Sequence, residues 1–123
     1  MICVSIADVT ADEACRIIQE HEISEVRLDR IQFKERDLER IFTSGRTVAT
    51  FRPVDGTDDG KRKDILKSAI RHGASYIDIE VESNDAYKNE LKKAAADAGC
   101  KSIVSYHDYE KTPVMRELEQ IIS

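Results

Sequence analysis

Hydrophobic and polar positions follow two different periods along the chain, and each period predicts a different kind of element. Short runs rich in Val, Ile, Tyr and Phe are typical of β-strands. The segments between these runs repeat apolar residues three and four positions apart, which indicates amphipathic helices. Five such pairs follow one another, so the pattern predicts a parallel sheet with helical crossovers. The predicted strands cover residues 2–7, 25–30, 47–52, 76–81 and 101–107.

The predicted helices carry recognisable end signals. Thr10 and Glu13 form a capping-box pair at the start of the first helix. The next three helices are expected to stop near glycines, which are Gly45, Gly73 and Gly99. Thr112 and Pro113 predict the start of a fifth helix, because Thr is a favourable N-cap and Pro fits the first helical position. The basic run at 61–63 is interpreted as a solvated first helical turn.

Linker-like composition is missing from the sequence. No Pro-, Gly- or Ser-rich stretch divides it. We therefore predict a single domain over residues 1–123, which ends after the fifth helix.

Polar side chains recur at every second position inside the predicted strands. Alternate residues of a strand share one face, so each strand would present polar groups to the same side of the sheet. These residues are Cys3 and Ser5, then Glu25, Arg27 and Asp29, then Thr50 and Arg52, then Asp78 and Glu80, and finally Ser105 and His107.

This polar face helps to choose between two architectures. A central strand of a flavodoxin-like, doubly wound sheet has helices on both faces and should read as almost continuously apolar. Burying unpaired charges under a helix would be costly. A barrel interior gives the same charges one shared space, where opposite signs can pair. The pattern therefore favours five βα units of a TIM-type (βα)8 barrel, incomplete at this length, with the flavodoxin-like sheet as the alternative.

Composition narrows the class of function. The chain has 19 Lys and Arg against 24 Asp and Glu, a net charge of −5, which argues against a nucleic-acid partner. The longest uninterrupted apolar run is Met1–Val4, so no membrane segment is expected. Cys3, Cys15 and Cys100 lie far apart and show no metal-ligand spacing. We expect neither a metal nor a disulfide, and a reducing cytoplasm as the location.

Three residues of the polar face are candidates for chemistry. His107 ends the last predicted strand, and its imidazole titrates near neutrality, so it could act as a general acid or base. Arg27 and Arg52 are fixed cations that suit the oxygens of a small anionic or hydroxylated ligand.

The carboxylates of the polar face have more than one possible role. Glu25 would accept from ligand hydroxyls or orient Arg27, and Asp29 would orient Arg27 or pair with Arg30. The acidic residues of the fourth strand would support the site or balance the arginines; they are Asp78 and Glu80.

Four segments together resemble the type I 3-dehydroquinate dehydratases of the shikimate pathway. They are EVRLD at 25–29, TFR at 50–52, DIE at 78–80 and SYHDYEKTP at 105–113. The resemblance runs along the whole chain but covers only the first half to five-eighths of the family's barrel. It implies an enzyme that dehydrates 3-dehydroquinate to 3-dehydroshikimate without a metal or an organic cofactor. It also implies that His107 is the general acid/base and that Glu25, Arg27 and Arg52 bind the substrate.

The resemblance also implies what this chain lacks. In the family, a lysine on the sixth barrel strand forms a Schiff base with the substrate ketone, and no matching segment is present. We expect that lysine to lie outside this chain, and the chain alone to be inactive. The unfinished sheet would expose two strand edges and its inner polar face, which favours a homo-oligomer or association with the missing C-terminal half. The alternatives are an inactive half-barrel with a binding or assembly role, and a flavodoxin-like domain that binds a small ligand.

Overall fold

The computed structural model describes residues 2–53, 59–80, 83–105 and 115–117. Strands and helices alternate along the first 105 residues, as the hydrophobic pattern predicts. In chain order the elements are β1 (Ile2–Ile6), α1 (Ala11–Glu20), β2 (Ser24–Arg27), α2 (Glu35–Thr43), β3 (Thr47–Thr50), α3 (Asp59–Arg71), β4 (Tyr76–Glu80), α4 (Asp85–Asp97), β5 (Lys101–Ser105) and β6 (Met115–Glu117).

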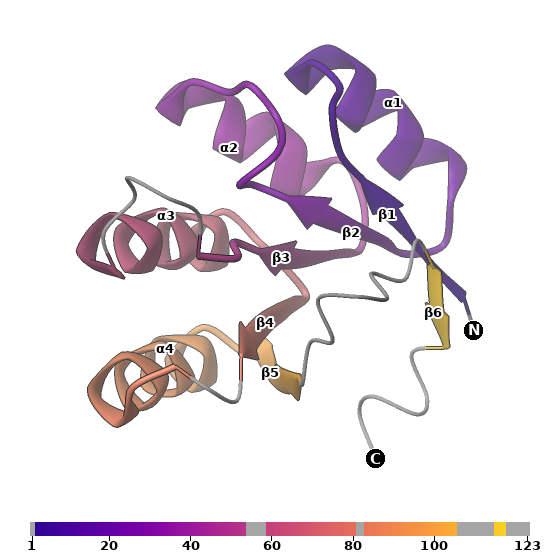
Figure 1. The fold of residues 1–123 in the computed structure, drawn as a ribbon. Helices are drawn as coiled ribbons and strands as arrows, with labels where there is room; N and C mark the ends of the chain where they lie inside the picture. The colour runs from indigo at the N-terminus through magenta and orange to yellow at the C-terminus, as the bar shows by residue number, and fades with distance from the viewer. Residues whose placement is uncertain (1, 54–58, 81–82, 106–114, 118–123) are drawn as a thin grey trace.

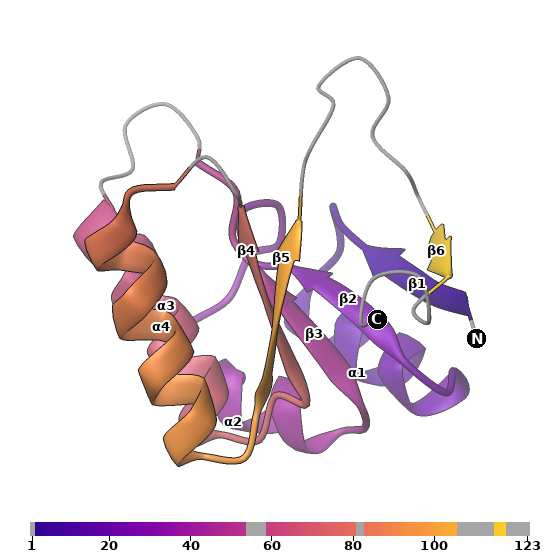
Figure 2. The ribbon, with the colours of Figure 1, turned by 90° about the horizontal axis from the view of Figure 1, so that it is seen from below.

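The order of the strands identifies the architecture. The sheet runs β5-β4-β3-β2-β1-β6, and its first five strands are parallel neighbours in chain order. The four helices of the described chain lie on one face of the sheet, which curves away from them (Figures 1 and 2). A barrel wall has this sequential order, whereas a doubly wound sheet reverses its order at a switch point. The barrel prediction is confirmed, and the flavodoxin-like alternative is wrong.

Residues 115–117 differ from the sequence prediction. They form the strand β6, so the predicted fifth helix is wrong at these positions. β6 runs antiparallel to β1, with Glu117 opposite Ile2 and Met115 opposite Val4. An unpaired strand edge offers backbone donors and acceptors that need partners, which gives a physical reason for a strand here. The expected open edge at β1 is wrong for the same reason.

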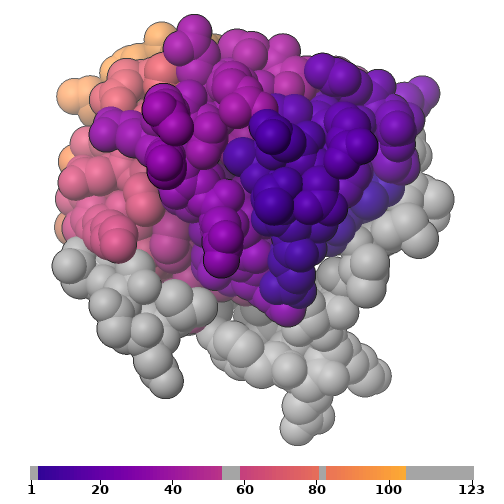
Figure 3. Space-filling view, turned by 90° about the horizontal axis from the view of Figure 1, so that it is seen from above, coloured from indigo at the N-terminus to yellow at the C-terminus, as the bar shows by residue number. Residues whose placement is uncertain are grey.

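The main hydrophobic core lies between the sheet and the helices. It is built from the outward-facing side chains of the strands and the inward-facing side chains of all four helices. Figure 3 shows the outer side of the helical layer, where α1 and α2 (indigo and purple) form a continuous surface. Fully burying one such aliphatic or aromatic side chain contributes roughly 1.5–3 kcal/mol. The largest strand and helix members include Val26, Ile77 and Ile79 with Ile18, Phe42, Leu66 and Leu91.

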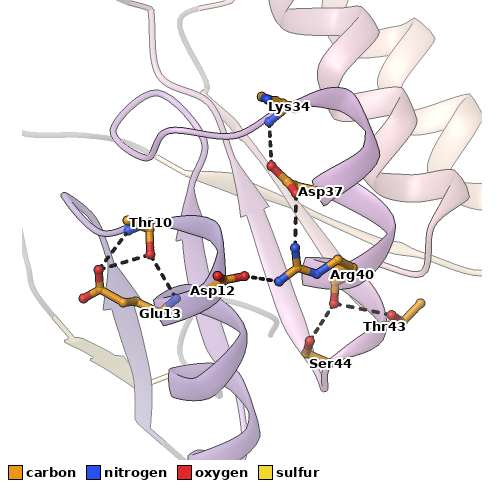
Figure 4. Close-up of polar contacts among 8 residues, drawn as sticks. All are labelled: Thr10, Asp12, Glu13, Lys34, Asp37, Arg40, Thr43 and Ser44. Atoms are coloured by element: carbon orange, nitrogen blue, oxygen red, sulfur yellow. Dashed lines mark hydrogen bonds and ion pairs between the residues drawn. The ribbon is translucent and has the colours of Figure 1, made fainter.

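Hydrogen bonds between side chains and backbone N–H groups cap the start of α1 and of α2, and an ion pair connects the two helices (Figure 4). The backbone N–H of Glu13 donates to the Thr10 hydroxyl at 3.2 Å, and the Thr10 N–H donates to the Glu13 carboxylate at 3.4 Å. This is the predicted capping box, and it is confirmed. On α2, Arg40 contacts both Asp37 of its own helix and Asp12 of α1. The exposed ends of the helices are thus fixed by polar contacts while their apolar faces form the core.

Glycines end α3 and α4 where the sequence predicts. Gly73 has a φ of 111° and Gly99 a φ of 74°, a region that residues with a Cβ rarely occupy. Gly45, after α2, serves a different purpose. A Cβ at Gly45 would lie 2.9 Å from the Cγ2 atom of Ile18, so the absent side chain lets the chain pass close to α1.

Candidate functional site

The concave face of the sheet, opposite the helices, has an apolar part and a polar part. A small apolar cluster lies toward the amino-terminal ends of the strands and consists of Cys3, Ile23, Val48, Tyr76 and Ile103. The polar residues follow on the same face toward the carboxyl ends. Register pairs such as Arg27 opposite Thr50 bring residues distant in the sequence into one row. In a TIM-type barrel this end of the strands is where active sites form.

Arg27 and Asp29 form a two-pronged ion pair within β2 and the residues after it. Nε of Arg27 donates to Oδ1 of Asp29 at 3.1 Å, and Nη2 donates to Oδ2 at 2.7 Å. Both side chains are buried, with exposed fractions of 8% and 1%. Of the two roles that the sequence left open for Asp29, the structure has the pairing with Arg27. Arg30 instead pairs with Asp8, at 2.5 Å.

The environment of Arg27 keeps its guanidinium charged. Burial alone would disfavour the charged form, but the hydrogen bonds and negative charge of Asp29 outweigh it, and Glu25 adds to the effect. The pKa of Arg27 is therefore raised above its ordinary value. The concave face holds a permanent cation whose orientation is fixed by a carboxylate.

Glu25 and Arg52 lie close to this pair. The Thr50 hydroxyl donates to Oε2 of Glu25 at 2.8 Å. The backbone N–H of Arg52 donates to Oδ1 of Asp29 at 3.4 Å. Glu25 is 2% exposed and Arg52 is 9% exposed, so the expectation of an open inner face is wrong for these residues. The structure thus brings together the three predicted substrate-binding residues, since Asp29 contacts both arginines and Glu25 acts on the charge of Arg27.

A second buried cluster lies at the ends of β3 and β4, and its centre was misjudged from the sequence. Arg62 of α3 is 2% exposed, so the interpretation of 61–63 as a solvated turn is wrong for this residue. Its Nη2 donates to Oε2 of Glu80 at 3.0 Å and to the carbonyl oxygen of Phe51 at 2.9 Å. Its Nη1 donates to Oδ1 of Asp59 at 2.9 Å. Glu80 therefore balances Arg62, an arginine that the sequence had not placed near it.

An aromatic ring completes this cluster. The guanidinium carbon of Arg62 lies 4.8 Å from the centre of the Tyr87 ring on α4, a distance typical of a cation–π contact. Burial raises the pKa of the Tyr87 phenol, although the charge of Arg62 opposes this effect. The phenol therefore stays neutral over the working range of an enzyme.

The sequence did contain a signal for the buried position of Arg62. Arg62 lies four residues before Leu66 and seven before Ala69, which puts all three on one helix face. Leu66 and Ala69 are fully buried. A single arginine on the apolar face of a predicted helix indicates a buried partner, and Glu80 is that partner.

The predicted general acid/base, His107, lies outside the described residues, so its role remains a prediction. A groove between α2 and α3, lined by Phe33, Leu38 and Ile65, lies on the helical side and includes none of the strand-end residues.

The described part of the chain has neither a metal-binding cluster nor a membrane-spanning helix. That part contains no group of three or more His, Cys, Asp or Glu that could hold a metal ion. None of its helices is long and apolar enough to cross a membrane.

A half-open barrel wall with buried, paired charges at its strand ends defines the class: this is part of a TIM-barrel protein with a polar site on the concave face. The comparison with family models is more specific. Residues 2–123 match the model of type I 3-dehydroquinase, and the chain belongs to that family.

Curated relatives support the same assignment. The chain is 34% identical to the 3-dehydroquinate dehydratase of Methanococcus vannielii and 36% identical to that of Desulfotalea psychrophila. The matches cover 99% and 98% of this chain but 60% and 57% of the two relatives. The chain therefore spans about 60% of the length of the curated relatives it matches.

Solved structures agree on the fold. A type I 3-dehydroquinate dehydratase from Clostridium difficile, in a structure with covalently modified comenic acid, superposes with a TM-score of 0.73 at 20% identity. The 3-dehydroquinate dehydratase of Enterococcus faecalis gives a TM-score of 0.69 at 22% identity. Both matches cover 90% of this chain, and they cover 52% and 55% of the two structures.

Proposed function

We propose that this chain supplies the substrate-holding and proton-transfer part of a type I 3-dehydroquinate dehydratase, which dehydrates 3-dehydroquinate to 3-dehydroshikimate. The observation that carries the proposal is the buried Arg27–Asp29 pair, with Arg52 and Glu25 beside it, on the concave face of a barrel wall of this family. Buried cations held by carboxylates suit a polyhydroxylated carboxylic acid, because each can donate several fixed hydrogen bonds.

The predicted chemistry divides the work between this chain and a lysine outside it. That lysine adds to the substrate ketone and expels water, which forms a protonated imine. His107 removes a proton from the adjacent carbon, and the electron pair moves into the imine. The β-hydroxyl then leaves as water with the proton held by His107, and a second water hydrolyses the imine. Arg27, Arg52 and Glu25 hold the substrate oxygens throughout.

The partner that would complete the site is the C-terminal part of the barrel, on this chain's polypeptide or on another. Two features of β5 support this arrangement. Among the described residues β5 is an edge strand of the sheet, and its outward-facing Val104 is 45% exposed. Its register partner Ile79 on β4 is fully buried beneath the helices. A further βα unit packed beside β5 would bury Val104 in the same way. We place this assembly in the cytoplasm, where a reducing environment would keep Cys3, Cys15 and Cys100 from forming disulfides.

A complementation experiment tests the proposal. The purified chain would be mixed with the C-terminal part of the Methanococcus vannielii relative, and dehydration followed by the ultraviolet absorbance of the enone product. We expect activity only in the mixture. Borohydride reduction in the presence of 3-dehydroquinate should leave a substrate adduct on the added fragment and none on the 13.9 kDa chain.

Matched variants identify the contribution of this chain. Arg52→Met should reduce kcat/KM in the mixture by roughly 10- to 100-fold, the usual scale for a hydrogen bond to a charged group. His107→Ala should reduce kcat by roughly 100- to 10,000-fold. Arg40→Met, at the exposed contact between α1 and α2, is the control and should leave the rate unchanged. If the mixture forms a stable complex without activity, the result would favour an inactive assembly module. Activity of the chain alone would contradict the proposed division of the work. A stable homo-oligomer that excludes the fragment would contradict it as well.

A further inference from the structure

Backbone pairing between β3 and β4 stops earlier than pairing in the neighbouring ladders. β3 and β4 pair Val48 with Tyr76 and Ala49 with Ile77. The β2–β3 ladder continues to Arg27 opposite Thr50, and the β4–β5 ladder continues to Glu80 opposite Ser105. At the end of the sheet where the polar residues lie, β3 and β4 are therefore held together by something other than the ladder.

The side chain of Arg62 spans this place. Nε and Nη2 both donate to the carbonyl oxygen of Phe51, at 3.1 and 2.9 Å. The same Nη2 donates to Glu80 on β4 at 3.0 Å. One guanidinium thus connects the residue after β3, the last residue of β4 and the first turn of α3.

The shape of the guanidinium suits this task. Its planar fork presents N–H groups along two edges, so the Phe51 carbonyl and the Glu80 carboxylate are reached together. A lysine ammonium is a compact charge on a flexible stem and could not reproduce both contacts with the same geometry. Burial of the charge is compensated by Glu80 and by the Tyr87 ring.

The position of the Phe51 carbonyl has a direct consequence for Arg52. This carbonyl and the N–H of Arg52 belong to one peptide unit, which is planar. Arg62 holds the carbonyl side of that plane, and Asp29 accepts from its N–H side at 3.4 Å. With both sides held, rotation of the plane is restrained, and the position of the Arg52 Cα atom, from which the side chain leaves the backbone, is restrained with it.

We propose that Arg62 is a positioning residue for Arg52, acting through the Phe51–Arg52 peptide plane. The proposal rests on the proposed function for the substrate role of Arg52. It assigns no contact between Arg62 and the substrate. The Phe51–Arg52 peptide is then held by two different parts of the chain: Asp29 follows β2, and Arg62 belongs to α3.

The first test needs no enzymatic activity. Arg62→Lys keeps the charge and removes the fork, and Arg40→Met is the control. Amide hydrogen exchange by NMR should show the Arg52 N–H exchanging at least tenfold faster in Arg62→Lys, with the β1–β2 amides unchanged. Equal protection of Arg52 in both proteins would overturn the proposal. If Arg62→Lys loses the fold, Glu80→Gln, which removes the charge but keeps the size, should produce the same local loss of protection, and its absence would also overturn the proposal.

The second test separates positioning from general stability. The chain would be titrated with 3-dehydroquinate by NMR. We expect Arg62→Lys to raise the Kd for 3-dehydroquinate roughly tenfold. In an Arg52→Met background, Arg62→Lys should cause no additional loss, because its effect passes through Arg52. Additive losses would overturn the positioning role. A wild-type chain that does not bind 3-dehydroquinate would contradict the proposed function, while the exchange experiment would still decide the link between Arg62 and Arg52.

Discussion

At the scale of single residues, two pairs of buried, opposite charges lie at the carboxyl ends of the strands. Arg27 is paired with Asp29, and Arg62 is paired with Glu80, with all four side chains nearly inaccessible. Removing one partner leaves the other charge buried without compensation, which is far more costly than loss of a surface pair. The site residues should therefore affect stability as well as binding.

Asp29→Asn tests this cost directly. The amide keeps the size of the side chain but removes the charge that faces Arg27. We expect the free energy of unfolding to fall by about 3 kcal/mol, the lower end of the range for breaking a buried pair. Urea denaturation measures it. Asp12→Asn is the control, because Asp12 pairs with Arg40 at the exposed surface and should change stability little. Equal effects of the two substitutions would show that burial of the Arg27–Asp29 pair carries no special cost.

The sequence predicted the identity of the concave-face residues better than their partners. Period-two alternation placed Glu25, Arg27 and Arg52 on one face, because a strand has a fixed side-chain period. Choosing between Arg27 and Arg30 as the partner of Asp29 required the backbone direction after β2, which a residue pattern does not contain. Arg62 was missed because a run of three basic residues suggests solvent, whereas its helical phase indicates the core.

At the scale of elements, charged contacts connect neighbouring helices on the outside of the wall. Glu90 of α4 contacts Lys63 and Lys67 of α3. Hydrogen bonds from these two lysines, followed by their charges, lower the pKa of Glu90 from 4.5 to about 2. A carboxylate with a lowered pKa in the folded state stabilises the protein above the unfolded pKa, and this contribution disappears as the pH falls through the folded value.

Glu90→Gln should therefore change the pH dependence of stability. The wild type is expected to be more stable than the variant near neutral pH, with the difference shrinking as the pH falls from about 4.5 to about 2. High salt should reduce the difference, since the contact is partly exposed. Urea denaturation over this pH range is the measurement. A difference that persists unchanged at the acid end would show that Glu90 acts through packing rather than charge.

Gly45→Ala tests the close approach of two elements. The added Cβ would lie 2.9 Å from Ile18 Cγ2 and 3.3 Å from the Ile18 carbonyl oxygen. The backbone oxygen cannot move away as a side chain can, so we expect a loss of about 1–3 kcal/mol in the free energy of unfolding. Thermal unfolding compares it with Ser44→Ala, which alters the neighbouring position. If Gly45→Ala is as stable as the wild type, the α1 approach is not tight in solution.

At the scale of the whole molecule, the order of the elements up to residue 105 was predictable and the strand at 115–117 was not. Local periodicity predicted the four helices and five parallel strands found up to residue 105, because each depends mainly on nearby residues. The strand at 115–117 depends on the edge of β1, more than a hundred residues away in the sequence, and local helix signals cannot report it. β6 covers the β1 edge of the sheet, whereas β5 forms the opposite edge of the described sheet. A strand that completes a barrel would pair with β5.

Val104 makes the β5 side a testable surface. Val104→Lys adds a charge on the outward face of β5, where the side chain is already half exposed, so the fold should tolerate it. If a further βα unit packs there, the substitution should weaken binding of the C-terminal fragment at least tenfold in sedimentation or calorimetry, because a lysine buried against an apolar surface loses its hydration. Gln19→Lys, the same change in charge on exposed residue 19 of α1, should leave the affinity unchanged. Equal binding by both variants would mean that the complementing half does not pack over β5, and that the wall is completed by a different arrangement.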